Sequence, residues 1–338
     1  MLRRTFLGTA LLAGAAAPLM AQASAAAGDA AAVVAEVARQ LERGYLIPAT
    51  GKRYAAMLRE RLAAGAYTGI TDPATLGSRL TADLQMVAPD RHLRIVKAEP
   101  PRAPAAQGAT PAGPPRAPGL QDAGWIADGV AYLRYVSWTD PANVAATEAF
   151  MRSHAGARTL VIDCRYNNGG GMDEMNVILP YLFARETRLV AFEMVEAIAA
   201  DQGSPFDGPS VRRVAAVTPG TVRWEHVAIP RADEQRWRTA KVFYLISGRT
   251  GSAAEHMALA MKHSGRAVLI GEPTGGANHF GGFEPVGWGL ALFLPVGRTV
   301  DLTTGEDWEV HGVAPDVATA PLAALQEALR RAGVTVPG

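Results

Sequence analysis

Residues 242–261 read VFYLISGRTGSAAEHMALAM and place one serine between two different patterns. The apolar run Val242–Ser247 predicts a buried strand. A glycine-containing turn follows, and Ala253–Met261 has the apolar spacing of an amphipathic helix. Ser252 is therefore expected at a helix N-terminus, where unpaired backbone N–H groups and the positive end of the helix dipole favour a developing oxyanion. Such a position suits a nucleophile.

The same serine has a second interpretation. Ser252-Ala-Ala-Glu255 is also a capping box, in which the serine and the glutamate satisfy each other's backbone N–H groups. The local sequence leaves both roles open, so the rest of the chain has to decide between them.

The composition is that of an ordinary globular protein. The chain has 338 residues, 49% of them hydrophobic and 19% charged, which is enough for one large core or two unequal ones. Its formal charge of +1 gives no electrostatic reason to expect nucleic acid or an anionic membrane as a partner. Beyond the N-terminus no apolar stretch is long enough to span a bilayer.

The N-terminus has the features of an export signal. Arg3-Arg4 precede Thr5-Phe6-Leu7 and a run of small and apolar residues. Ala21-Gln22-Ala23 fits a signal-peptidase site, and Ala25-Ala26-Ala27 is a competing site. The paired arginines resemble a twin-arginine signal, and a general secretory signal is the alternative. Either signal covers residues 1–27 and predicts a periplasmic or secreted protein. The single cysteine, Cys164, excludes an intramolecular disulfide, and its apolar surroundings predict a buried structural thiol.

The mature chain divides into three predicted parts. Residues 28–97 read as a small helical domain, because apolar residues recur on one face of three successive segments. Residues 98–120 are rich in proline and alanine and predict a linker. In residues 121–338, strand and helix patterns alternate, which favours an α/β domain with partly parallel pairing.

A serine nucleophile needs a base, and the seven histidines are the first candidates. His256 lies one helical turn after Ser252, where we expect an exposed histidine or one satisfied within the helix. His256 and His263 lack a third donor at a suitable spacing, so we expect no metal. His92 differs, because it lies in the polar segment Asp90-Arg91-His92 where the helical pattern ends.

Several motifs together resemble a known family, the C-terminal-processing (tail-specific) serine peptidases. These motifs are Ser252–Glu255, Ile162–Gly170, Gly271–Gly276 and Trp308–Asp316. The match is closer to the branch without a PDZ domain, named for the interphotoreceptor retinoid-binding protein. In that branch the helical N-terminal domain ends in a segment similar to Leu80–Arg94. Four motifs in the same order make the resemblance specific, and it spans roughly Ala30 to Val317.

The resemblance implies a catalytic triad. Ser252 matches the nucleophile, His92 the base and Glu309 the carboxylate that orients the base. The lysine that serves as base in the PDZ-containing branch would fall near Ala277, which cannot accept a proton. Lys262 does not match that position, and we expect it to be a surface residue.

The resemblance also implies an oxyanion hole made of backbone amides. One donor is the N–H of Ala253, and the other is a glycine of the Asn168–Gly171 run, Gly170 or Gly169, since a missing β-carbon allows close approach. Arg165 and Asn167 are expected to support this loop.

The fold implied is a crotonase/ClpP-like ββα-spiral α/β domain preceded by the helical domain. The implied function is an exported serine endopeptidase that cleaves peptides or unfolded segments and needs no cofactor. The alternative is a non-catalytic binding protein for apolar ligands or peptides on the same scaffold. An α/β-hydrolase esterase is disfavoured, because Thr250–Ala254 lacks the Gly-x-Ser-x-Gly pattern.

Overall fold

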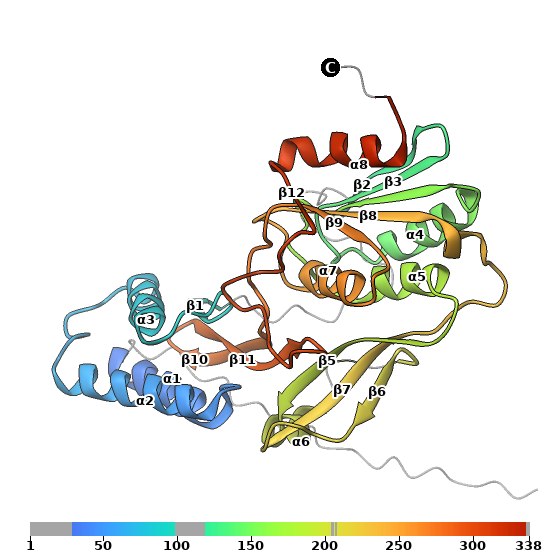
Figure 1. Cartoon of the computed structure of the whole chain (residues 1–338). Coiled ribbons are helices and arrows are strands. Elements are labelled where there is room, and N and C mark those ends of the chain that lie inside the picture. The colour runs from blue at the N-terminus through green and yellow to red at the C-terminus, as the bar shows by residue number, and fades with distance from the viewer. Residues whose placement is uncertain (1–28, 99–118, 204–205, 207, 336–338) are drawn as a thin grey trace, which may run out of the picture.

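The computed structural model describes residues 29–98, 119–203, 206 and 208–335 (Figure 1). The predicted export segment, residues 1–27, and most of the predicted linker, residues 98–120, lie outside the described residues. Within the described residues, no helix has both the length and the apolar character needed to cross a membrane.

Three helices open the described chain: α1 (Ala30–Gly44), α2 (Pro48–Ala63) and α3 (Pro73–Val87). Two of them have an aspartate as N-cap. The Asp29 carboxylate accepts the N–H of Ala31, and the Asp72 carboxylate accepts the N–H of Thr75. The apolar faces expected from the 3.6-residue spacing are the buried ones.

The three helices bury these faces against a β-sheet and not only against one another. One hydrophobic cluster joins Leu41 and Leu80 to Phe192, Leu292 and Leu294 of the sheet. The short strand β1 (Arg94–Lys97), which follows the helices, pairs antiparallel with β11 (Leu290–Val300). The helical segment is therefore one wall of a core that it shares with strands at least 100 residues further along the chain.

This first sheet is antiparallel, in the order β1-β11-β5-β7-β6, with β10 also paired to β11. Its remaining strands are β5 (Thr187–Val195), β6 (Val211–Val214), β7 (Thr221–Ala228) and β10 (Phe280–Gly287). The short helix α6 (Glu196–Gln202) follows β5.

The second sheet has the order β12-β9-β8-β4-β3-β2, parallel except for the hairpin of β2 and β3. Its strands are β2 (Leu120–Ala127), β3 (Val130–Tyr135), β4 (Thr159–Asp163), β8 (Lys241–Ile246), β9 (Val268–Gly271) and β12 (Val317–Ala318). The helices associated with it are α4 (Ala142–Ser153), α5 (Asp173–Leu182), α7 (Ala253–His263) and α8 (Ala324–Ala332). Helices α4, α5 and α7 cover one face of the sheet and α8 covers the other (Figure 1).

Helix α7 lies between the two sheets, in contact with β5 of the first and with β8 and β9 of the second (Figure 1). Strands β4 and β8 are parallel neighbours, with Asp163 paired to Leu245. Their carboxyl ends therefore release two loops side by side. One loop is the glycine run after β4, and the other leads through Gly251 to Ser252.

The predicted fold class, an α/β domain preceded by a helical N-terminal segment, is confirmed. Cys164 is fully buried after β4, and burial raises the pKa of its thiol to about 12, which agrees with a structural role.

Candidate active site

Ser252 immediately precedes α7 and has a strained backbone. Its φ of +53° and ψ of −123° lie in a region that a residue with a β-carbon rarely adopts. Strain of this kind costs on the order of 1–3 kcal/mol and persists only where neighbouring contacts impose it. The following contacts at Ser252 supply that constraint.

The Glu255 carboxylate holds the serine backbone in place. It accepts the N–H of Ser252 at 2.8 Å, which is one half of the predicted capping box. It also accepts the N–H of Gly276 at 2.7 Å, the N–H of Ala277 at 2.8 Å and the hydroxyl of Thr274 at 2.5 Å. Glu255 is fully buried, and burial raises the pKa of its carboxyl despite these four bonds. The capping interpretation and the active-site interpretation of this motif are therefore compatible, because the glutamate fixes the backbone of a serine whose side chain faces a pocket.

The glycine run packs directly on this turn. A β-carbon on Gly169, whose φ is +94°, would lie 2.7 Å from both Gly251 O and Ser252 Cβ. A β-carbon on Gly170 would lie 2.2 Å from Trp138 O. Only glycine lets the two loops approach this closely.

The amides of the glycine run differ in what they already bind. The Gly169 N–H donates to Asn167 Oδ1 at 2.9 Å, and the Gly171 N–H donates to Trp138 O at 2.7 Å. Among the described residues, the N–H groups of Gly170 and Ala253 have no hydrogen-bond partner. Both of these residues line the same pocket as Ser252. The geometry therefore leaves Gly170 and Ala253, and not Gly169, with amides free to bind an oxyanion.

Arg165 and Asn167 support the glycine run through hydrogen bonds. The Arg165 guanidinium donates to both oxygens of Asp163, at 2.9 and 2.6 Å, and to Pro321 O at 2.5 Å. The backbone carbonyl of Asn167 accepts the N–H of Gly251 at 2.9 Å, and this bond connects the two loops. These bonds hold the loop in place and leave neither side chain directed at Ser252.

Ser252 opens onto a pocket of about 400 Å³ between the two sheets. Much of its wall is apolar, and it includes Phe192, Phe280 and Trp308. The size is within the range of sites that bind small ligands or substrate side chains.

His256 shares this pocket with Ser252 and belongs to a buried pair of imidazoles. His256 Nε2 lies 2.9 Å from His226 Nδ1, and His226 Nε2 lies 2.9 Å from Asn176 Oδ1. Burial lowers the pKa of His226 to about 4 and the pKa of His256 well below its usual value, so both rings are neutral at pH 7. The sequence predicted an exposed histidine or one satisfied within the helix. Instead His256 is buried, and its partner His226 comes from β7, 30 residues away.

His92 is not among the residues that line this pocket. Its ring stacks on Phe293 at 5.4 Å between centroids, and burial lowers the pKa of its imidazole to about 4. Its Nδ1 atom is buried without a hydrogen-bond partner. Among the described residues, no hydrogen bond or ion pair joins His92 to Ser252 or to Glu309.

Glu309 is bound by backbone amides of two distant segments. Its Oε1 accepts the N–H of Arg91 at 2.6 Å. Its Oε2 accepts the N–H groups of Asn278 at 2.7 Å and His279 at 3.1 Å. The imidazole nearest to this carboxylate is that of His279, with Nδ1 at 3.8 Å from Oε2. Glu309 therefore holds the His92 segment through the backbone of the preceding residue.

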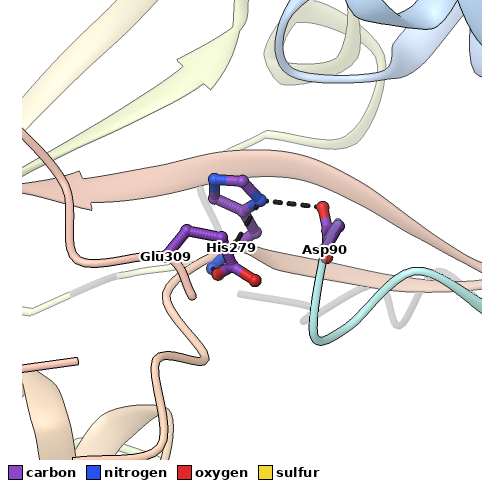
Figure 2. A group of neighbouring side chains, drawn as sticks. All are labelled: Asp90, His279 and Glu309. Atoms are coloured by element: carbon purple, nitrogen blue, oxygen red, sulfur yellow. Dashed lines mark hydrogen bonds and ion pairs between the residues drawn. The ribbon is translucent and has the colours of Figure 1, made fainter. Parts of the chain in front are cut away.

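Figure 2 shows His279 between Asp90 and Glu309. His279 Nδ1 lies 2.8 Å from Asp90 Oδ2, and Nε2 lies 3.7 Å from Asp307 Oδ2. Burial lowers the pKa of His279, but the neighbouring carboxylates of Asp307, Asp90 and Glu309 outweigh burial and raise the pKa to about 9. His279 is therefore an imidazolium at neutral pH, surrounded by carboxylates.

The donor atoms of Asp90, His279 and Glu309 lie close enough together to suggest a metal site. However, both Asp90 oxygens already accept hydrogen bonds: Oδ1 from the N–H groups of His92 and Leu93, and Oδ2 from the Tyr45 hydroxyl and His279. Both Glu309 oxygens also accept backbone N–H groups. A charged imidazole has no lone pair for a cation. This donor set fits an ion-pair cluster that joins the N-terminal segment to the pocket.

Lys262 is on the surface at the opposite end of α7 from Ser252. Its ammonium donates to Ala314 O at 2.7 Å and pairs with Asp316 at 3.2 Å. Its position does not allow it to serve Ser252 as a base.

The His279 cluster predicts a stability loss at alkaline pH. A group whose pKa is raised by folding stabilises the protein fully below its unfolded value, here about 6.5, and loses that effect as pH rises through about 9. We expect the free energy of unfolding to fall by on the order of 3 kcal/mol over this interval. Denaturant unfolding at several pH values measures it. His279→Gln should flatten this fall and His154→Gln should not; an equally steep fall in His279→Gln would assign the effect to other groups.

Two protein-family models match the chain. Residues 129–319, more than half of the chain, match the family model described as peptidase family S41. Residues 25–123 match the model described as the N-terminal domain of peptidase S41 in eukaryotic IRBP.

Solved structures show the same fold. The photosystem II D1 C-terminal processing protease has a TM-score of 0.56 and 17% identity, with 90% of this chain and 97% of that chain covered. A lipoprotein from Streptococcus agalactiae has a TM-score of 0.57 and 15% identity, covering 90% and 97%. A putative peptidase from Parabacteroides merdae ATCC 43184 has a TM-score of 0.58 and 16% identity, covering 87% and 90%. With a family model that spans more than half of its length, the chain belongs to peptidase family S41.

Proposed function

We propose that this protein is a serine endopeptidase that hydrolyses peptides or unfolded protein segments with Ser252 as its nucleophile. One observation carries the proposal. A strained serine at the start of α7 shares a pocket with the two unpartnered amides of Gly170 and Ala253. Family membership supports a peptidase acting on a peptide or protein substrate.

The chemistry follows from this arrangement. Ser252 Oγ attacks the scissile carbonyl while a base takes its proton, and the carbonyl oxygen becomes an oxyanion between the N–H groups of Gly170 and Ala253. The base then gives the proton to the leaving amine, and an acyl-enzyme remains. Water then attacks the ester carbonyl while the base takes its proton. The base returns the proton to Ser252 Oγ as the acid product is released. The positive end of the α7 dipole favours the oxyanion at both stages.

For the base we propose His92, with Glu309 as its supporting carboxylate. The motif resemblance supports this assignment, and so does the bond from Glu309 to the N–H of Arg91, the residue before His92. Nδ1 of His92 has no hydrogen-bond partner among the described residues, so no hydrogen bond through this atom holds the ring in its stack on Phe293. The proposal requires the ring to leave this stack and reach Ser252 when substrate is bound.

Export is also proposed. The arginine pair and small-residue run of residues 1–27 support it. We expect the protein purified from the periplasm or medium to begin between residues 22 and 28 by mass spectrometry. Recovery of the full-length chain from the cytoplasm alone would contradict export and leave the peptidase proposal intact.

The role of Ser252 predicts covalent labelling by a fluorophosphonate probe, because an activated serine hydroxyl attacks the phosphorus. We expect the wild type to label, Ser252→Ala to lose labelling completely, and Ser264→Ala, on the same helix, to label like the wild type. Gel fluorescence and intact mass measure the adduct. A folded wild type that never labels would favour the alternative function, a non-catalytic protein that binds apolar ligands or peptides in the same pocket.

The role of His92 predicts a large loss of turnover. His92→Ala should lower kcat by about 10³-fold or more, as expected for removal of a triad base, while His154→Ala should stay near the wild type. Since the base must be neutral, kcat/KM should rise with pH through the pKa of His92 in the free enzyme, about 4 in the stacked position. If His92→Ala kept wild-type turnover, the base would be sought at His256, the imidazole that shares the pocket with Ser252.

A further inference from the structure

The pocket beside Ser252 has an aromatic wall built by Phe192 of β5, Phe280 of β10 and Phe206 from the segment between α6 and β6. The rings of Phe192 and Phe206 stack at 4.1 Å between centroids with 20° between their planes. The ring of Phe280 meets Phe206 edge-on at 4.9 Å. Both geometries are favourable arrangements for aromatic rings, and a further ring would find faces and edges to pack against.

Trp308 contributes to this wall from the Glu309 loop. It is 6% exposed, and its Nε1 is buried without a hydrogen-bond partner among the described residues. Because that nitrogen is buried, Trp308 offers the pocket its apolar ring surface, and packing in the core fixes the side chain.

The imidazole that lines the pocket is neutral, and its donor and acceptor nitrogens can be assigned. With Asn176 Oδ1 facing His226, the His226 Nε2–H donates to it, so His226 Nδ1 must accept from the Nε2–H of His256. His256 Nδ1 is then the ring nitrogen that keeps a lone pair. Among the described residues it has no hydrogen-bond partner, and His256 lines the pocket. The pocket therefore offers an acceptor for one hydroxyl or amide proton.

The charge of the lining limits what can enter. Asp173, in the first turn of α5, is the lining residue with a formal charge, since both imidazoles are neutral. A carboxylate in the pocket would lose its hydration and meet Asp173, and no cation of the lining would compensate. An apolar ring loses little on entering.

We propose that this pocket binds an aromatic side chain of the substrate, on the residue whose carbonyl Ser252 attacks, and that tyrosine is favoured over phenylalanine because its hydroxyl donates to His256 Nδ1. This inference rests on the proposed peptidase function. It assigns specificity to Phe192, Phe280 and Trp308 by packing and to His256 by one hydrogen bond, which His226 and Asn176 orient.

The test uses quenched fluorescent peptides that share one flanking sequence and carry Tyr, Phe, Leu, Ala, Lys or Asp at a single position. Mass spectrometry identifies the bond cleaved. We expect cleavage after the varied residue, with kcat/KM for Tyr and Phe at least about 10-fold above Ala, and Asp about 100-fold or more below Phe. Tyr should exceed Phe by about 5-fold, the size of one hydrogen bond to a neutral group.

His256→Leu separates packing from the hydrogen bond. It should bring the Tyr/Phe ratio to about one while the preference of Phe over Ala remains, and His154→Leu should keep both ratios. Retained fluorophosphonate labelling shows that the variant is folded. If His256→Leu does not fold, the wild-type peptide series alone decides.

The two proposals can fail separately. A wild type that labels with fluorophosphonate but cleaves best after Ala or Lys, or only before Tyr, overturns the aromatic pocket and leaves the peptidase standing. A wild type that neither labels nor cleaves any peptide overturns the peptidase proposal and this inference with it.

Discussion

The buried carboxylate of Glu255 is the contact on which the candidate site depends. It accepts four hydrogen bonds, one from the Ser252 backbone and three from the segment Thr274–Ala277. It thereby supports the positive φ of Ser252 and connects the turn to the segment that leads through His279 into β10. Removing the Glu255 carboxylate would leave three backbone N–H groups and the Thr274 hydroxyl without their acceptor. Each buried unpaired group costs about 1–3 kcal/mol. The nucleophile, the pocket wall and the ion-pair cluster are thus joined through a single side chain.

The parts of the fold that depend on local pattern could be predicted from the sequence. The strand ending at Ile246, the helix starting at Ala253 and the helices before Val87 all follow from apolar spacing and capping residues. The pairing of β1 with β11 and the sharing of one core by the helices and the first sheet could not, because they join segments far apart in the chain. Strand β10 was also missed, since its glycines and proline hide the alternation of a strand.

The candidate site shows the same division. Gly170 and Gly169 were equivalent by sequence, and only the hydrogen bonds of their amides distinguish them. His256 was singled out by its spacing from Ser252, but its neutral state depends on His226 and Asn176, which arrive from other elements. Motif position paired His92 with Glu309, whereas the folded chain puts the His279 imidazole nearer to that carboxylate. Sequence spacing identifies candidate residues, but the tertiary structure determines which side chains they contact.

Strand β1 gives the N-terminal segment a role beyond covering a surface. It occupies the edge of the first sheet beside β11, and Tyr45 and Asp90 extend the connection to His279. A fragment trimmed to the region matched by the S41 model, residues 129–319, would therefore expose an unpaired strand edge and the apolar side chains of Leu292 and Leu294. Exposed strand edges of this kind pair with other chains, so we expect such a fragment to aggregate and not to act as a minimal enzyme.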